Sequence, residues 1–404
     1  MKDRRIGKKA AALLLAIALL CGIASGCGGD DSSSSSSASA GNGTFAADET
    51  MGSSANSKGD ITNPKKDITN PKGEITNPKG TEQQSGKLKN TDSQFSSCLK
   101  GSIDENSFEG VAYLTENGGE VYSSGDNITD LYRVASVSKQ FTAAAVLMLY
   151  EDGKLDITSS IEKYFPEYSH VGEITIHQLM CMSSGIPDYI VMADGIASPE
   201  QTYSMSAENS SETNRSIIKN WVFNRDLIFT PGTQNYYCNT NYLLLAEIVT
   251  KAAGMPYEKY IEQKMLAPLG MTSTGFGDTW NGGSVVEKAG ENYEWFRYKG
   301  ICYGCADMIS NAVDLEKWGH EFIDNKVLSD SIINLMTQDY SGGYGYGIIP
   351  DAQSGFVYHD GNLPPYTSTL CVGKSRGLVL VMLDCSSSSS LSSVRQSVFG
   401  IVKN

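Results

Sequence analysis

The sequence predicts an α+β fold, because segments of different type follow one another along the chain in blocks. Strand-like segments come first, at residues 110–114 and 120–122. A long middle section, from about 137 to 335, has mainly helical patterns and long loops. Strand-like segments then return at 344–349, 355–359, 367–372 and 377–383. The folded part is expected to cover residues 95–404, which is long enough for one large domain or two subdomains.

The chain begins with a basic and then apolar segment. Five Lys or Arg residues lie among the first nine, followed by the apolar run Ala10–Ile23 and by Ala24-Ser25-Gly26-Cys27. This pattern resembles a bacterial lipoprotein signal over residues 1–27, with cleavage before Cys27 and lipid on its thiol. Ala24 replaces the Leu that is more usual three residues before the cysteine. Ordinary secretion or an uncleaved anchor therefore stays open.

Residues 28–94 have the composition of a tether. They contain the serine run Ser32–Ser37 and three related heptads, at 60–66, 67–73 and 74–80. Each heptad has one Ile and one Pro, which is too little apolar surface for a core, so disorder is expected. A flexible chain of this length spans on the order of 40–50 Å. We expect a spacer that holds the folded domain clear of a membrane and has no ligand of its own.

The motif Ser136-Val137-Ser138-Lys139 lies between an apolar lead-in at 131–135 and a helical stretch at 141–150. Ser136 is therefore predicted at the start of a buried helix, with Lys139 one turn later on the same face. The helix N-terminus can polarise the serine hydroxyl there, and a desolvated lysine can take its proton. A serine N-cap with a solvent-facing lysine is the alternative. Ser-x-x-Lys also occurs at 97–100, 160–163 and 216–219, so spacing alone selects nothing.

The motif Tyr237-Cys238-Asn239 follows a turn signal at 229–233 and precedes a predicted helix at 242–249. It is therefore expected on a loop that enters a helix, which is a common place for functional side chains. Among the 21 tyrosines, only Tyr237 has an asparagine two residues later. A surface tyrosine beside a helix-capping asparagine is the alternative interpretation.

The motif His359-Asp360-Gly361 lies between strand-like segments at 355–358 and 367–372, which predict an antiparallel strand pair. Gly361 would allow the backbone of a substrate to approach the strand closely. The same His-x-Gly pattern occurs at 170–172, and an ordinary histidine at a strand end is the alternative.

In this order, the three motifs resemble the serine hydrolase family of class C β-lactamases, D-alanyl-D-alanine carboxypeptidases, D-aminopeptidases and related esterases. Further matching segments are 137–144, 174–180, 183–189, 231–233, 239–242 and 314–318. The resemblance covers roughly residues 95–404. It implies an α+β (or α/β) sandwich, an antiparallel sheet built from both chain ends and flanked by helices. An inserted, mostly helical subdomain would stand beside the sheet, with Ser136 at the floor of the cleft between them.

The resemblance also implies roles for the reacting groups. Ser136 would attack a carbonyl carbon and become acylated, and Lys139 would help to remove its proton. Tyr237 would pass the proton to the leaving group and later activate water. Whether Lys139 or Tyr237 is the principal base stays open, because either group needs a pKa lowered by burial or by a neighbouring charge.

The remaining roles concern binding. Asn239 would hold Lys139 and the substrate amide, and His359 would assist Tyr237 or bind the substrate. The backbone N–H groups of Ser136 and Asn362 would form an oxyanion hole, in which one donor is worth about 10²–10³ in rate. Gly361 would line the substrate site.

Several positions depart from the family pattern and bear on the substrate class. His359 stands where class C β-lactamases typically carry Lys, which favours peptidase-like or esterase-like members. His-Asp-Gly-Asn replaces His-Thr-Gly-Gly, so an acid, Asp360, is expected at the rim of the cleft. The remaining departures are Leu363-Pro364-Pro365-Tyr366 after this motif, Cys181-Met182 in place of His-Thr, and Cys238 inside Tyr-x-Asn.

Charge and cysteine content exclude other classes. The net charge is −14, and the first 27 residues carry +4, so a mature chain would carry −18. Nucleic-acid binders present basic faces, so no nucleic-acid partner is expected. Seven scattered cysteines follow Cys27, an odd number that argues against a full disulfide framework. Cys302 and Cys305 form a single Cys-x-x-Cys pair, and no metal or other cofactor is expected.

The leading functional hypothesis is a serine acyl-enzyme hydrolase, a D-specific peptidase or carboxypeptidase acting on cell-wall-type peptides. A class C-like β-lactamase and a broad-specificity esterase remain alternatives, because all three share the same acyl-enzyme chemistry. A non-catalytic penicillin-binding envelope protein is the alternative of another class. The expected partners are a peptide, β-lactam or ester substrate, peptidoglycan, and a membrane reached through the lipidated N-terminus. The expected location is extracytoplasmic, at the cell envelope.

Overall fold

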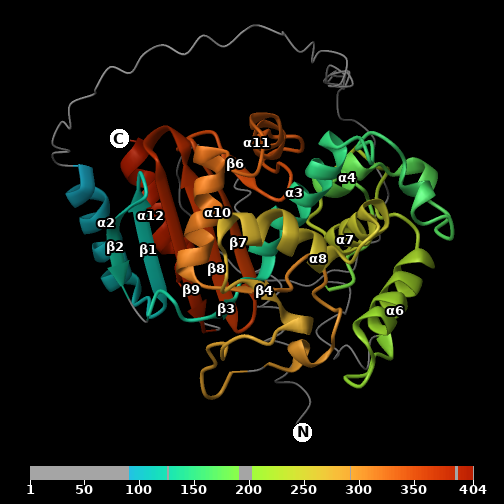
Figure 1. Cartoon of the computed structure of the whole chain (residues 1–404), viewed down its shortest axis with the longest axis horizontal. Helices are drawn as coiled ribbons and strands as arrows, with labels where there is room; N and C mark the ends of the chain where they lie inside the picture. The colour runs from blue at the N-terminus through green and yellow to red at the C-terminus, as the bar shows by residue number, and fades with distance from the viewer. Residues whose placement is uncertain (1–90, 125–126, 191–202, 292, 387–389, 404) are drawn as a thin grey trace, which may run out of the picture. The chain divides into compact units, whose positions relative to one another are not determined.

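A computed structural model describes residues 91–124, 127–190, 203–291, 293–386 and 390–403 (Figure 1). The predicted signal and almost all of the predicted tether lie outside the described residues. The first described element, helix α2 (Thr91–Asn106), begins four residues before the start expected for the folded part. Among the described residues, no helix combines the length and the apolar character needed to cross a membrane.

The larger of two sheets has six strands in the order β2-β1-β9-β8-β7-β6, and every neighbouring pair is antiparallel. Its strands are β1 (Val111–Glu116), β2 (Gly119–Ser124), β6 (Ile349–Asp351), β7 (Phe356–Leu363), β8 (Tyr366–Gly373) and β9 (Leu378–Cys385). The first strand, β1, pairs along its whole length with the last strand, β9. The expectation of an antiparallel sheet built from both ends of the chain is therefore confirmed (Figure 1).

Helices cover both faces of this sheet. On one face, α2 and α12 (Leu391–Lys403) pack together over the strands, with Phe399 stacked on Phe356. On the other face, α10 (Ala312–Asp324) lies across β1, β8 and β9 (Figure 1). All eight residues of β9 are buried, because alternate side chains enter the two layers of core. This double coverage explains why β9 reads as an unbroken apolar run.

One strand prediction is wrong. Residues 344–349 were expected to be extended, but the strand β6 begins only at Ile349. The segment before it alternates Tyr and Gly, and its tyrosines Tyr344 and Tyr346 are buried, which imitates the period of a strand. Gly347 has φ of +70°, however, and the Tyr346 N–H donates to the Met336 carbonyl rather than to a sheet.

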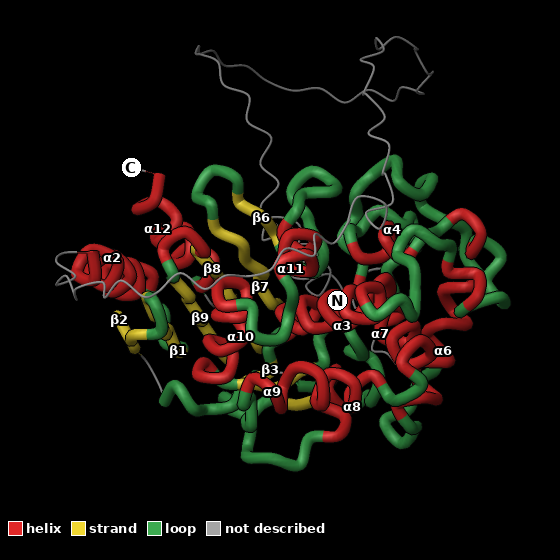
Figure 2. Tube along the Cα trace, turned by 45° about the horizontal axis from the view of Figure 1, so that its top comes forward, coloured by secondary structure: helices red, strands yellow, loops and turns green. Residues whose placement is uncertain are grey.

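The middle of the chain forms the helical part, as predicted. The remaining α-helices in the described part of this section are α3 (Ser138–Glu151), α4 (Ile176–Met180), α6 (Ser211–Phe223), α7 (Asn239–Ala253), α8 (Tyr257–Ile261), α9 (Ala267–Leu269) and α11 (Asp330–Thr337). A π-helical turn, Glu262–Leu266, joins α8 to α9. The sequence did not predict a small antiparallel sheet made of β3 (Tyr132–Arg133), β5 (Met308–Ser310) and β4 (Gly275–Phe276). In Figure 2 the large sheet lies to one side of α3, and α4, α6 and α7 lie to the other.

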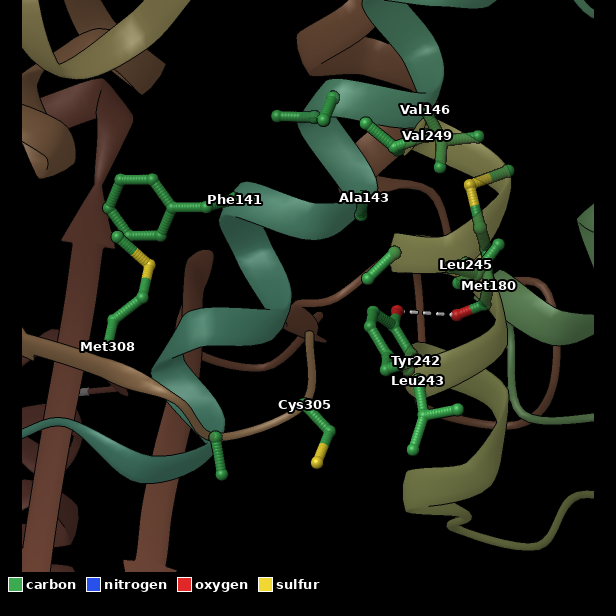
Figure 3. Packing of buried hydrophobic residues seen from close by; sticks show 14 of the residues in the cluster. Phe141, Ala143, Val146, Met180, Tyr242, Leu243, Leu245, Val249, Cys305 and Met308 are labelled. Carbon is green, nitrogen blue, oxygen red and sulfur yellow. Dashed lines mark hydrogen bonds between the residues drawn. The ribbon is translucent and has the colours of Figure 1, made fainter. Parts of the chain in front are cut away.

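Helix α3 is the core of the molecule, since all but two of its residues are buried. Figure 3 shows Phe141 pointing toward Met308 on one side of α3, while Val146 meets Val249 of α7 on the other. Trp318 of α10 stacks on Phe141 with ring centroids 4.2 Å apart and donates its indole N–H to Gln140. The sheet layer and the helical part are thus both fixed to the helix that follows Ser136.

Candidate active site

Ser136 lies in a short 3₁₀ turn, Ala135–Val137, that runs directly into α3. Ala135 has φ of +44°, which is a strained conformation for a residue with a side chain. The strain is held by neighbouring bonds: the Val134 N–H donates to the Met308 carbonyl at 3.0 Å, and Ser138 Oγ donates to the Ala135 carbonyl at 2.7 Å. Ser136 itself remains 8% exposed, at the predicted place at the start of a buried helix.

Lys139 is fully buried and points at Ser136, so the alternative of a solvent-facing lysine is wrong. Its Nζ lies 3.0 Å from Ser136 Oγ, 2.8 Å from Asn239 Oδ1 and 2.9 Å from the Cys305 carbonyl oxygen. The amide and peptide oxygens can only accept, so they take two N–H groups in either protonation state. The third contact of Lys139 Nζ is with the Ser136 hydroxyl. This hydroxyl can accept a hydrogen bond from an ammonium or donate one to a neutral amine. A neutral Lys139 would therefore present its lone pair to Ser136.

Tyr237 stands beside this lysine, on the loop that enters α7, as predicted. Its ring centroid is 4.8 Å from Lys139 Nζ. The ring also lies edge-on to Tyr344, with centroids 6.0 Å apart, and 6.1 Å from the His359 ring. The structure thus brings the serine, the lysine, the tyrosine and the histidine of the three motifs to one place.

Asn239 is the first residue of α7, and Asp188 holds it from behind. The Asp188 carboxylate accepts from the Asn239 backbone N–H at 3.0 Å and from Asn239 Nδ2 at 2.9 Å. The loop that carries Asp188 is fastened to α7 by two more bonds, from Ser184 Oγ to Asn241 Oδ1 and from the Tyr189 N–H to Thr240. Sequence reasoning matched the 183–189 and 239–242 segments to a family but gave Asp188 no role. The segments 183–189 and 239–242 contact each other in the structure, which explains why the family sequence pattern includes both.

His359 is 2% exposed, and both of its ring nitrogens are used. Nδ1 lies 2.6 Å from the Asp360 carbonyl oxygen, which can only accept, so Nδ1 carries the proton. Nε2 must then accept, and Tyr344 donates its hydroxyl to it at 2.9 Å. Burial, assisted by the charge of Lys139, lowers the pKa of His359 to about 3. The imidazole is therefore neutral near pH 7, and its described hydrogen bonds lead to Tyr344, a residue that sequence reasoning missed.

Gly361 is needed for the packing of β7 against the turn that carries Ser136. A Cβ at this position would overlap Ser368 Oγ and the carbonyl oxygen of Val134, and would also crowd Ala135. The glycine thus lets β7 approach the turn that carries Ser136, and its predicted role beside the substrate backbone stays a prediction. Asn362 follows on the same strand and is exposed. The role of its backbone N–H in an oxyanion hole stays a prediction.

The expectation that Asp360 faces the rim of a cleft is wrong. Its carboxylate accepts from Arg395 Nη2 of α12 at 2.8 Å and from Thr369 Oγ1 at 2.6 Å. Alternate residues of a strand point to opposite faces. Because His359 and Gly361 face the helical part, Asp360 must face α12, where it neutralises an arginine whose side chain is only 3% exposed.

The other departures from the family pattern serve local packing. Met182 Sδ accepts from the Cys238 backbone N–H at 3.3 Å, and Cys181 Sγ lies 3.2 Å from Ser183 Oγ. All seven cysteines in the described part of the chain are free, and six are buried. Burial raises the pKa of the Cys181 thiol and of the Cys305 thiol to about 11. Within the described residues, no three His, Cys, Asp or Glu side chains are arranged to hold a metal ion.

Comparisons with known proteins agree with this geometry. The family model described as Beta-lactamase matches residues 95–388. PbpX of Bacillus subtilis (strain 168), whose name describes a penicillin-binding protein, is 26% identical over 298 residues, which are 69% of this chain and 71% of PbpX. Protein flp of Staphylococcus aureus (strain NCTC 8325 / PS 47) is 26% identical over 281 residues, 63% of this chain and about half (53%) of flp.

Among solved structures, the D-stereospecific amidohydrolase from Streptomyces sp. superposes with a TM-score of 0.64 at 21% identity. The superposition covers 75% of this chain and 98% of that protein. At this level of identity the likeness concerns the fold, and it agrees with the antiparallel sheet flanked by helices described above.

The close approach at Gly361 leads to a first prediction. Gly361→Ala should slow the labelling of Ser136 by a fluorophosphonate at least tenfold, because β7 or the 134–135 backbone must move. The overpacking should also lower the free energy of unfolding by about 1–3 kcal/mol. Gly172→Ala is the matched control, since a Cβ there would meet nothing within 4 Å and the residue belongs to the other His-x-Gly sequence. Equal labelling rates for Gly361→Ala and wild type would contradict this account of β7.

The buried neutral His359 leads to a prediction about pH. Its pKa falls from 6.5 to about 3 on folding, so the unfolded chain binds the extra proton between these values. The stabilisation is thus complete above pH 6.5 and is lost as the pH falls below it, by at most about 1.4 kcal/mol per pH unit. His359→Gln should remove this component from the urea-derived unfolding free energy measured between pH 7 and pH 4.

The control for this experiment is His170→Gln, because the His170 side chain is 25% exposed and pairs with Glu173. The loss of slope should be larger in His359→Gln than in this variant. If the slope of His359→Gln equalled that of wild type, the imidazole would not be held neutral in the folded state.

Proposed function

We propose that this protein, which belongs to the Beta-lactamase family and is a serine hydrolase, hydrolyses peptide or amide bonds of D-amino acids in cell-wall-type peptides. The observation that carries the proposal is the aim of the buried Lys139 Nζ at Ser136 Oγ, 3.0 Å away. The names of PbpX, as a penicillin-binding protein, and of the D-stereospecific amidohydrolase support the choice of substrate class.

In the first half of the reaction, Ser136 Oγ attacks the carbonyl carbon of the scissile bond and its proton passes to Lys139 Nζ. We assign this base role to Lys139, because its Nζ lies within hydrogen-bond distance of the Ser136 hydroxyl. The C–N bond then breaks, and the leaving amine takes a proton through Tyr237, whose ring lies beside Lys139. An ester now links the substrate acyl group to Ser136.

In the second half, water attacks the acyl carbon of this ester. The same groups remove one proton from the water and return one to Ser136 Oγ as the C–O bond breaks, releasing a carboxylic acid. The free Ser136 hydroxyl and the resting enzyme are thereby restored. The oxyanion that forms in each half would be stabilised by the backbone N–H groups of Ser136 and Asn362.

The substrate backbone would bind along the edge of β7. The neighbouring strand β6 pairs with β7 only over Phe356–Tyr358. Beyond Tyr358, no described strand pairs with this side of β7, so the strand has an open edge beside the turn that carries Ser136. An extended peptide can add to such an edge as one more strand. This arrangement favours a peptide over a compact ester as the natural substrate.

Three other functions are distinguished from the proposed peptidase by the same experiment. A class C-like β-lactamase and a broad esterase would use the same acyl-enzyme, but the neutral His359 offers no cation where class C β-lactamases typically carry Lys. A non-catalytic binder is disfavoured by the completeness of the Ser136, Lys139 and Asn239 arrangement, because a binder would not need a buried amine beside a hydroxyl.

Turnover of a small panel of substrates tests the proposal. The catalytic efficiency should be highest for a D-Ala-D-Ala peptide, lower for nitrocefin and p-nitrophenyl acetate, and undetectable for the L-Ala-L-Ala peptide. Ser136→Ala should abolish hydrolysis and labelling by fluorescent penicillin, and Lys139→Met should lower the rate by about 10²–10⁴. Ser216→Ala is the matched control, because this exposed serine in α6 also begins a Ser-x-x-Lys sequence. A preference for nitrocefin or the ester would overturn the peptidase assignment.

We also propose that the protein is an extracytoplasmic lipoprotein, anchored through Cys27 and held within reach of peptidoglycan by residues 28–94. The proposal is supported by the basic and apolar pattern of residues 1–27. Cys27→Ser should move the protein from the membrane to the soluble fraction of cells, whereas Cys21→Ser, inside the segment expected to be removed, should leave it at the membrane. Retention of Cys27→Ser at the membrane would show that lipidation is not the anchor.

A further inference from the structure

We propose that Asp188 is a positioning residue for this reaction: its carboxylate fixes the Asn239 amide and sets the pH at which Ser136 becomes reactive. The inference rests on the proposed roles of Ser136 as nucleophile and Lys139 as base. It adds a fourth group, supplied by a loop, to the three motifs that the sequence singles out.

The contacts of Asp188 define its state. The residue is fully buried on the loop that follows α4. One carboxylate oxygen accepts from the Ile190 N–H at 2.8 Å, and the other accepts from the Asn239 N–H and Nδ2 at 3.0 and 2.9 Å. All three partners are donors. An ionised carboxylate satisfies them, whereas a protonated one would place its O–H against an N–H.

These bonds determine how Asn239 faces Lys139. Because Asp188 takes the Nδ2 group, the amide must direct Oδ1 at Lys139 Nζ, 2.8 Å away. If the amide turned over, its oxygen would face a carboxylate and its NH₂ would face an ammonium. Asp188 therefore holds the lysine in line with Ser136 through the Asn239 amide.

Asp188 is also the negative charge that accompanies the buried Lys139. Burial raises the pKa of Asp188, while its three N–H donors and the Lys139 charge act in the opposite direction. Several other titratable groups around the pair are held neutral near pH 7 by burial. Burial raises the pKa of each of the following above its ordinary value: Tyr189, Tyr203, Tyr236, Cys238, Tyr242, Cys305 and Asp307. The pKa of Asp307 rises to about 8, and that of His359 falls to about 3.

The charge of Asp188 has a definite effect on the base. A carboxylate separated from an ammonium by a single amide group stabilises the protonated amine, so it delays the appearance of the neutral base as the pH rises. Removing the carboxylate charge must favour the neutral amine at lower pH. The same sign holds if Tyr237 acts as the base, because loss of a negative neighbour also favours a phenolate.

Asparagine cannot replace Asp188 without conflict. Whichever way its amide is turned, an NH₂ group faces either the Ile190 N–H or the two donors of Asn239. Turning Asn239 over relieves only the conflict with its side chain, and it then directs the Asn239 NH₂ at Lys139. Asp188→Asn should thus have two separate effects, a shift in pH dependence from the lost charge and a slower reaction from the misaligned amide.

The experiment measures the rate of Ser136 labelling by a fluorophosphonate from pH 5 to pH 10, which requires no knowledge of the natural substrate. For Asp188→Asn, the midpoint of the acid limb should move to lower pH by about one unit. The plateau rate should fall about 10–100-fold, as expected for a buried donor that faces another donor. Thermal unfolding at each pH establishes that the labelled variants are folded.

Two further variants move the charge instead of removing it. Asn239→Asp places a carboxylate next to Lys139, so the midpoint of the acid limb should rise above that of wild type. In Asp188→Asn/Asn239→Asp the amide and the carboxylate exchange places, so the amide NH₂ can donate to the new carboxylate, while one backbone N–H, of Ile190 or of residue 239, still loses its acceptor. The double variant should keep the raised midpoint and recover part of the stability that each single variant loses. If Asp188→Asn does not fold, these two variants decide the question.

Asp314→Asn is the matched control. Asp314 is 2% exposed and accepts from the Ser273 N–H, Thr274 Oγ1 and Lys317 Nζ, so it is also a buried carboxylate with three donors. Its replacement should lower stability and leave the midpoint unchanged. An unchanged or raised midpoint in Asp188→Asn, or an equal shift in Asp314→Asn, would overturn the inference.

The outcomes also separate this inference from the proposed function. Labelling of wild type without hydrolysis of the D-peptide would overturn the substrate class and leave the role of Asp188 standing. Complete absence of labelling of wild type would remove Ser136 as the nucleophile, and the inference would fall with it.

Discussion

The placement of Lys139 is the constraint on which the arrangement of the site depends. The ammonium group of Lys139 is buried, and burial of a charge costs free energy unless every N–H of the ammonium has an acceptor. The three acceptors come from residues 136, 239 and 305, which are far apart in the sequence. The turn before α3, the start of α7 and the 302–305 turn must therefore meet at one point, and the packing of α3 against the rest of the core keeps them there.

A second constraint joins this lysine to the sheet. β7 approaches the backbone at 134–135 so closely that only a glycine fits at position 361. The strand is anchored from its other face, where Asp360 pairs with Arg395 of α12. Two neighbouring residues of one motif thus contact opposite sides of β7. Gly361 allows the turn that carries Ser136 to pack against the strand, and Asp360 fixes the strand to α12. A strand held on both sides cannot shift relative to Ser136, which is what a preorganised site requires.

The sequence was informative where local pattern and function coincide. The helix after Ser136, the loop before Asn239 and the strands of the large sheet were predicted from periodicity, turn residues and a resemblance to a family. The small sheet was missed because strands of two or three residues leave no periodic signal. The Tyr-Gly alternation at 344–347 was misread because a large side chain at every second residue occurs in strands and in some irregular loops. Asp188, Tyr344 and the Cys305 carbonyl were missed because their roles exist only through contacts made in three dimensions.

His359 shows how a motif can be located correctly and its chemistry still depend on the fold. From sequence, a histidine in this position is compatible with a cation, a base or a binding group. The Asp360 carbonyl leaves only one tautomer, Tyr344 occupies the remaining nitrogen, and burial next to Lys139 keeps the ring neutral. A neutral acceptor beside Tyr237 cannot attract an anionic substrate group in the way that a lysine would. A histidine at this position leaves the site without the positive charge that a lysine would supply. This difference affects which substrates bind, while the nucleophile Ser136 and its base stay the same.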